Sequence, residues 1–221
     1  YFEGERGHQF RILRAVKNRF GPVDEIGVFE MTGAGLAEVR NPSALFLSDR
    51  EKPAPGSVVF AGVEGTRPLL VEIQALVAQS PLTNARRTVV GWDSQRLSMI
   101  LAVLESRCNL SFANMDVYLN IAGGMRISEP AADLAIAAAL ISARQDTSLP
   151  RNLVTFGEIS LSGGLRPISQ AEARLKEAKK LGFSDAFAPS RMKLTSNSGM
   201  NVKKVENINA FIVQCFGNLE A

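Results

Sequence analysis

Residues 131–143 form the least polar stretch of the chain, and they constrain its fold more than any other segment. Between Ala131 and Ala143 only Asp133 and Ser142 are polar. A helix that is apolar on nearly every side must be buried on every side. An apolar strand is expected just before it at 116–122, DVYLNIA. The sequence therefore predicts a strand-loop-helix unit with a central, buried helix.

The predicted helix has a recognisable beginning. Ser128 can cap the free N–H groups, Glu129 suits the positive end of the helix dipole, and Pro130 occupies a position that needs no N–H. Many enzymes place a nucleophile at such a corner, because the free N–H groups stabilise an oxyanion. Here the first turn carries only Ala131 and Ala132, which can perform no such chemistry.

Strands and helices are expected to alternate along the rest of the chain, apart from antiparallel pairs near its start. Period-two and period-3.6 apolar patterns mark both kinds of element. Strands are predicted at 10–16, 26–31, 36–39, 57–63, 68–77, 86–91, 153–156 and 187–188, a hairpin at 158–167, and helices at 94–108, 169–181 and 207–216. The fold class is therefore α/β (α+β) with a mixed sheet. The glycine pairs at 33–35 and 163–164 lack the spacing of phosphate loops and predict turns.

Composition narrows the possible functions only a little. With 46% hydrophobic and 21% charged residues and a net charge of +3, the chain is an ordinary globular protein for which nucleic-acid binding is permitted but not required. Cys108 and Cys215 lie in apolar helical patterns and predict buried free thiols. His8 has no partner for a metal site. We expect no metal, no membrane span and a cytoplasmic location.

Two blocks of the sequence resemble the proteolytic domain of Lon proteases. The first is the helix start GGMRISEPAAD, and the second is GEISLSGGLRPISQAEARLKEAKKLGF at 157–183. By this resemblance the catalytic serine falls on Ala131 and the catalytic lysine on Glu172. Both halves of the dyad are lost, so we expect no catalytic residue and no proteolysis. The resemblance also implies the fold, a mixed-sheet Lon protease-like domain of the ribosomal protein S5 domain 2-like type.

A more specific resemblance covers the whole chain. KNRFG at 17–21, EIGVFEMTGAGLAEVRNPSALFLSDR at 25–50 and the Lon-like blocks in this order resemble the RadA (Sms) family of bacterial DNA repair proteins. The resemblance implies that 1–52 is the C-terminal edge of a RecA-like ATPase core with the KNRFG motif and a linker, and that 53–221 is a non-proteolytic Lon-like domain. The phosphate loop and a zinc finger are then expected upstream.

The same resemblance implies a function. The full-length protein would be a hexameric, DNA-dependent ATPase that promotes branch migration in DNA repair, using ATP and magnesium, with zinc in its finger. This chain would bind no cofactor itself, and would act as an oligomerisation scaffold and a DNA-binding surface. Single-stranded or branched DNA, further copies of itself, the recombinase RecA and replicative helicase-like proteins would be its partners.

Lys17 and Arg19 lie two residues apart in an extended segment, so both point to one face. From the residues alone, a solvated basic edge is the favoured explanation. By the family resemblance, they couple ATP and DNA in trans, near the phosphates bound by the neighbouring subunit. A guanidinium delivered from outside can stabilise developing phosphoryl charge.

Basic residues recur late in the chain. Either a solvated helix face or a surface that follows a phosphate backbone explains them. The DNA-binding candidates are Arg86, Arg87, Arg166, Arg174, Lys176, Lys179 and Lys180. Aromatic residues are not interleaved with them, so base stacking is not expected.

A Lon-type peptidase with a displaced dyad is the alternative function. Ser128 precedes Ala131 by three residues, and Lys176 follows Glu172 by four. One helical turn moves a side chain by about 5–6 Å, which is too far for a reaction that tolerates little misplacement.

Overall fold

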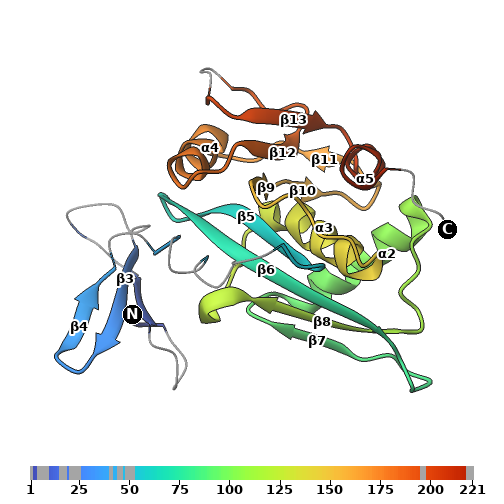
Figure 1. Cartoon of the computed structure of the whole chain (residues 1–221), viewed down its shortest axis with the longest axis horizontal. Helices are drawn as coiled ribbons and strands as arrows, with labels where there is room; N and C mark the ends of the chain where they lie inside the picture. Colours follow the sequence, from blue (N-terminus) through green and yellow to red (C-terminus); the bar gives the residue numbers. More distant parts are fainter. Residues whose placement is uncertain are drawn as a thin grey trace.

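The chain is arranged around a large mixed sheet (Figure 1). The computed structural model describes residues 2–3, 10–14, 19, 26–39, 42–43, 47, 53–194 and 198–217. In spatial order the seven strands are β13 (Asn201–Val205), β12 (Asp185–Pro189), β9 (Leu153–Thr155), β5 (Ser57–Glu64), β6 (Arg67–Gln79), β8 (Met115–Ile121) and β7 (Arg87–Val90). Strand β6 runs antiparallel to both its neighbours, whereas every other neighbouring pair is parallel. The predicted mixed-sheet α/β fold is confirmed.

Helices pack on the sheet, and one of them covers its central strands. They are α2 (Ser94–Cys108), α3 (Asp133–Arg144), α4 (Ala171–Lys180) and α5 (Ile208–Phe216), with short 3-10 turns η1 (Ala122–Gly124) and η2 (Pro130–Ala132). Helix α3 packs on β5 and β6 and also contacts α2. Its residues 133–142 are all buried, as the apolar pattern predicts. Figure 1 shows α4 and α5 near β12 and β13, and β7 and β8 at the opposite end of the sheet.

A second, smaller sheet is built from the first part of the chain. Its antiparallel strands are β1 (Phe2–Glu3), β2 (Phe10–Arg14), β3 (Ile26–Thr32) and β4 (Gly35–Glu38). The segment that follows makes contact with the large sheet, because the buried Ser43 hydroxyl accepts a hydrogen bond from Leu70 N–H at 3.0 Å. The domain boundary near residue 52 stays a prediction. The sequence RNPSALFLSDREKPAPG at 40–56 also predicts a linker with a short helical turn at 43–47, of which the structure describes only Ser43 and Leu47.

Local chemistry explains most boundaries. Asp93 caps α2 by accepting a hydrogen bond from Arg96 N–H, and Asn207 caps α5 through Ala210 N–H, as helix N-caps commonly do. Both predicted glycine turns are confirmed: Gly33 lies in the turn between β3 and β4, and Gly163 in the turn between β10 (Glu158–Ile159) and β11 (Leu165–Arg166).

Two expectations about elements are wrong. Ser128 makes no cap, because the N-cap position of η2 belongs to Glu129, and no side-chain cap bond forms there. Strand β13 was not expected from the sequence. Its two lysines interrupt the apolar alternation of NVKKV, so the pattern does not indicate a strand. The lysines are tolerated because this strand lies at the edge of the sheet, where charged side chains remain solvated.

Candidate functional site: the vacated dyad positions and the basic surfaces

Ala131, which takes the place of a nucleophile by sequence resemblance, lies in the buried turn that opens α3. Its side chain is closed off from solvent, with 2% of the residue exposed. Its carbonyl accepts a hydrogen bond from Gly157 N–H at 2.7 Å, and the Gly157 carbonyl accepts one from Leu134 N–H at 3.0 Å. This double link ties the helix start to the segment after β9. A methyl group in such a place can pack but cannot react.

Glu129, just before this turn, forms a partly buried ion pair with Arg174 of α4. Arg174 is fully buried, and its guanidinium donates to both carboxylate oxygens of Glu129, one of them at 3.0 Å. The same guanidinium donates to the Ala61 carbonyl at 2.9 Å, and Glu129 accepts from Val63 N–H at 3.0 Å. The pair therefore joins strand β5, the start of α3 and helix α4.

This geometry corrects the assignment of Arg174 to a DNA-binding surface. A guanidinium with no exposed area cannot reach a phosphate in solution. Its carbon atom lies 5.9 Å from the centroid of the Phe156 ring, a distance at which a cation is attracted to an aromatic face. Arg174 is thus a structural residue.

Asp133, two residues after Ala131, forms a second ion pair at the other side of the turn. Both carboxylate oxygens accept from Arg96 of α2, at 2.6 Å each, and one also accepts from Ile159 N–H at 2.9 Å. Burial raises the pKa of the Asp133 carboxyl, whereas the bonds from Arg96 and Ile159 oppose that rise. The same pair raises the pKa of Arg96. The two-pronged geometry is that of an ionised pair.

The vacated dyad is therefore flanked by fixed charges rather than by reactive groups. Glu172, at the lysine position, is half-buried in the first turn of α4. The thiols offer no substitute nucleophile, since burial raises the pKa of Cys108 to about 11 and that of Cys215 to about 12. Both cysteines are free and half-buried, so the prediction of free thiols is confirmed and that of full burial is not. The two ion pairs hold α2, α3, α4 and β5 together.

The candidate cations Arg86 and Arg87 lie at the start of the edge strand β7, and both are exposed. Arg87 donates to the carbonyls of Phe112 and Met115, so its guanidinium supports the turn before β8. Arg86 donates its backbone N–H to the Asp116 carboxylate at 2.7 Å. That bond does not involve the guanidinium of Arg86. Arg86 is thus better placed than Arg87 to meet a phosphate.

The remaining cations gather near the other end of the sheet. Arg166 is exposed and pairs with Glu158 at 3.2 Å. The α4 lysines are exposed as well, and Lys180 lies 3.6 Å from Glu177. The unexpected strand β13 adds Lys203 and Lys204, both exposed. The exposed cations Lys176, Lys179 and Lys180 therefore form a basic surface on α4, whereas Lys203 and Lys204 are consecutive residues of β13 and point to opposite faces of the sheet, with Lys203 over the Phe187 ring.

The KNRFG residues are only partly described. Arg19 is exposed, while Lys17 and His8 lie outside the described residues. The trans role of Lys17 and Arg19 stays a prediction.

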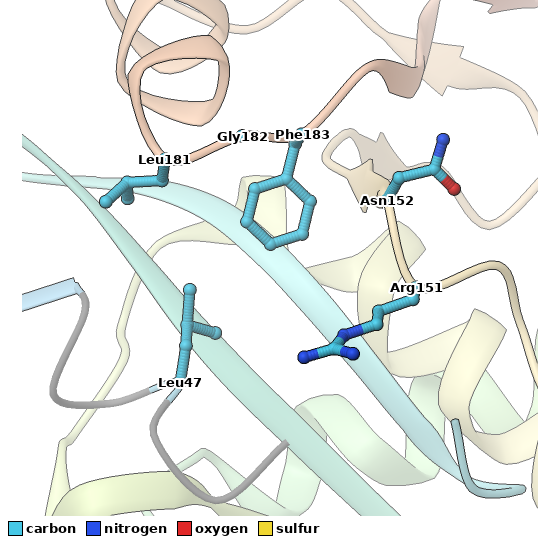
Figure 2. A pocket seen from close by; sticks show the side chains of 6 residues that line it. All are labelled: Leu47, Arg151, Asn152, Leu181, Gly182 and Phe183. Carbon is cyan, nitrogen blue, oxygen red and sulfur yellow. The ribbon is translucent and has the colours of Figure 1, made fainter. Parts of the chain in front are cut away.

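A cavity of about 330 Å³ lies where the segment after the small sheet meets the large domain. Figure 2 shows Leu47 from that segment facing Leu181 and Phe183, with the Arg151 guanidinium at the side; Asn152 and Gly182 complete the lining. Apolar side chains from two parts of the chain thus line the same cavity, and the Arg151 guanidinium lies beside them.

Within the described part of the chain, no group of three or more His, Cys, Asp or Glu residues could hold a metal ion. Among the helices of that part, none combines the length and apolarity needed to cross a bilayer.

Comparisons with known proteins identify relatives of this chain. Residues 85–192 match the family model described as subunit ChlI of Mg-chelatase. A DNA repair protein RadA from Brucella abortus (strain 2308) is 66% identical over 190 residues, which are 86% of this chain and 41% of that protein. The RadA of Rickettsia felis (strain ATCC VR-1525 / URRWXCal2) is 54% identical over 96% of this chain and 48% of its own length. The RadA of Streptococcus pyogenes serotype M3 (strain ATCC BAA-595 / MGAS315) is 51% identical over 86% of this chain and 42% of its own length.

The chain spans less than half the length of these relatives. The matched part is their C-terminal region. With more than half of the aligned residues identical to proteins from three distinct genera, the chain belongs to the RadA family of DNA repair proteins.

Proposed function

We propose that this chain is the non-catalytic C-terminal region of a hexameric, DNA-dependent ATPase that promotes branch migration of recombination intermediates. The observation that carries the proposal is the presence, around Ala131, of two ion pairs that each have one fully buried partner, where the resemblance would place a reactive dyad. Such charges, which join α2, α3, α4 and β5, preserve a packed domain. A domain that keeps its packing without its chemistry serves as a scaffold and a binding surface.

In this proposal the exposed lysines of α4 contact a DNA backbone, and the large domain holds the subunits of a ring together. Phosphate contacts by lysine carry no sequence information, so binding would be independent of base sequence. Lys17 and Arg19 would reach the ATP phosphates of the neighbouring subunit. ATP and magnesium would bind to the preceding ATPase core, and zinc to a finger further upstream. RecA and replicative helicase-like proteins would be partners in the cytoplasm.

The scaffold role is tested by the mass of the chain in solution, measured with and without single-stranded DNA. We expect assemblies larger than a monomer, and more of them when DNA is present. Two results together would contradict the scaffold role. The chain alone would stay monomeric at high concentration, and the full-length protein would keep its ring after deletion of residues 57–221.

The trans role of Arg19 is tested by mixing full-length subunits. Arg19→Ala should leave ATP binding largely intact and slow hydrolysis, because a cation that meets the γ-phosphate acts chiefly as charge develops in the transition state. A second subunit that keeps Arg19 but lacks its own phosphate-loop lysine should partly restore activity in mixed rings. Absence of complementation, or loss of ATP binding in Arg19→Ala, would return Arg19 to a structural basic edge.

The peptidase alternative gains no support. Ser128 and Lys176 are both exposed, and the serine that a displaced dyad requires is held outside the turn that carries Ala131. No observation favours a second function over the first.

A further inference from the structure

A groove outside the basic surface combines the two side chains that single-stranded nucleic acid most often meets. Its volume is about 490 Å³, and it lies beside the ends of strands β5 and β7 and the segment that leads to η2. Its lining is formed by Trp92, Arg126, Val89, Gly91, Ile127, Ser128 and Glu64. Trp92 is the only tryptophan of the chain. It is half-buried, whereas Arg126 is exposed.

Backbone contacts hold the two sides of this groove in register. Gly91 accepts a hydrogen bond from Ile127 N–H at 2.9 Å. A Cβ atom added to Gly91, whose φ is +82°, would lie only 2.3 Å from the Met125 carbonyl oxygen. Residues 91–92 therefore run directly beside residues 126–127. Trp92 and Arg126, each adjacent to a residue of this bonded pair, are thus held close together before any ligand arrives.

The second support for Trp92 is helix α2. Asp93, the next residue, caps that helix by accepting from Arg96 N–H at 2.8 Å. Arg96 is in turn fixed by the buried Asp133. The residue after Trp92 is therefore anchored to α2, so a ligand that stacks on the indole loses less free energy in ordering the protein.

The chemistry of the lining favours a nucleotide. An aromatic face offers stacking to any base, and a guanidinium beside it can bind the phosphate, which together form the usual means of holding a single strand. Glu64 at the same groove repels phosphate, and its carboxylate can accept a hydrogen bond from the amino group of cytosine. An extended acidic peptide would also pair with Arg126, but it would leave the indole without a flat partner.

We propose that this groove binds one nucleotide of single-stranded DNA, with the base against Trp92 and the phosphate at Arg126. The proposal rests on the proposed function, since it supplies the DNA contact of that function with a base-stacking site. It also revises the sequence-based expectation that base stacking plays no part. Strand β7 leads from the exposed Arg86 toward the groove, so a strand bound at Trp92 can continue along that edge of the sheet.

The single tryptophan makes the test direct. We expect a 20-nucleotide oligo-dC to quench the tryptophan fluorescence of this chain, while the anisotropy of a dye on the oligonucleotide reports total binding. An abasic strand of equal length should bind without quenching. Trp92→Leu should weaken the anisotropy-detected binding by roughly 5- to 150-fold, the range that stacking of one base contributes.

Matched variants separate the groove from general charge. Arg126→Gln should reduce both quenching and affinity, whereas Arg107→Gln, which removes an exposed cation from the end of α2, should reduce affinity less and leave the quenching at saturation unchanged. Circular dichroism would verify that each variant is folded, and the wild-type quenching result needs no variant at all.

Three outcomes would overturn the proposal. If anisotropy detects binding but the tryptophan is not quenched, the groove is not the binding site, although the DNA contact of the proposed function remains. A polyglutamate peptide that quenches equally and displaces the oligonucleotide would make the groove a site for acidic peptides. Absence of any anisotropy change would remove the proposed DNA contact and this site with it.

Discussion

The carboxylate of Asp133 accepts two hydrogen bonds of 2.6 Å from the guanidinium of Arg96, across the contact between α3 and α2. The Asp133 side chain is fully buried, and the Arg96 side chain is 25% exposed. Glu129, which pairs with Arg174, and Asp133, which pairs with Arg96, lie two residues before and two residues after Ala131. Both carboxylates near Ala131 are thus already ion-paired. The start of the central helix is therefore fixed by electrostatics as well as by apolar packing.

Removing one partner of this pair should destabilise the domain strongly. Asp133→Ala leaves a guanidinium without its carboxylate and Ile159 N–H without its acceptor, so we expect a loss of about 3–5 kcal/mol in the free energy of unfolding. Urea denaturation followed by circular dichroism measures it. Arg166→Gln, which breaks the exposed pair with Glu158, is the control and should cost less than about 1 kcal/mol. Equal losses in the two variants would mean that the buried pair is worth no more than a surface pair.

Restoring the two dyad side chains should not restore proteolysis. In the variant carrying Ala131→Ser and Glu172→Lys, the ion pairs of Arg174 with Glu129 and of Arg96 with Asp133 still occupy the surroundings of the turn. We expect less than about a hundredth of the turnover of a competent enzyme, because small misplacements of a nucleophile already cost about a hundredfold.

Release of a fluorogenic casein and labelling by a fluorophosphonate are suitable measurements. The parent chain, which should cleave neither peptide nor ATP, is the control. Labelling that depends on both substitutions would show that the reactive geometry survives beneath the ion pairs.

Gly56 should tolerate no side chain. Its φ is +82°, and an added Cβ would lie 2.0 Å from the carbonyl oxygen of Ala75. Its N–H also donates to the buried Ser142 hydroxyl at 2.8 Å. Gly56→Ala therefore combines left-handed backbone strain with a clash against main chain, and we expect it to lower the free energy of unfolding by about 3 kcal/mol or more.

Gly182→Ala provides the matched control for that substitution. Its φ is +88°, but nothing lies within 4 Å of the added Cβ, so only the backbone strain of about 1–2 kcal/mol should appear. Thermal melts of both variants would separate the two contributions. Similar losses would mean that the strand carrying Ala75 can shift to accept the methyl group.

Asp185 should make the stability of the domain depend on acid. Hydrogen bonds from the Ser184 hydroxyl and from Asn201 lower the pKa of this carboxyl, with a further contribution from the Lys203 charge. A carboxyl whose folded pKa lies below its unfolded value of about 3.9 stabilises the fold above that value. The stabilisation is lost as the pH falls through the folded pKa.

Asp185→Asn should consequently lower the urea midpoint at pH 7, and its difference from wild type should shrink below about pH 4. Urea titrations at pH 7, 5, 3.5 and 2.5 would measure this. Asp146→Asn, a substitution in an exposed turn, is the control with the same change of charge. A difference that stays constant over this range would assign the effect of Asp185→Asn to shape rather than to charge.

Much of the fold follows from the sequence because its elements carry their own periodicity. Helix α2 occupies the predicted residues 94–108, and the β5–β6 hairpin appears where two β-rich runs flank Gly65. Boundaries set by tertiary partners were less predictable. Glu129 is drawn to Arg174, 45 residues later in the chain, so the expected cap by Ser128 does not form.

Arg174 shows where local reasoning about the site fails. It lies among basic residues on α4, which favours an exposed surface, yet it shares the inward stripe with Ala171, Leu175 and Ala178. That position is a signal the sequence does contain. The identity of its partner, the half-buried Glu129, cannot be predicted in this way, because nothing in local periodicity relates the two residues. The Trp92 groove was missed for the same reason, since residues 91–92 and 126–127 meet only in the folded chain.

The order of strands in the large sheet has a consequence for synthesis of the protein. Strand β5 pairs on one side with β6, which follows at once, and on the other side with β9, which begins about 90 residues later. At typical translation rates the ribosome needs about 5–20 s to make those residues. During that interval the β5–β6 hairpin presents an apolar, unpaired edge to the cell. The sheet can therefore close on that side of β5 only after much of the domain has been synthesised.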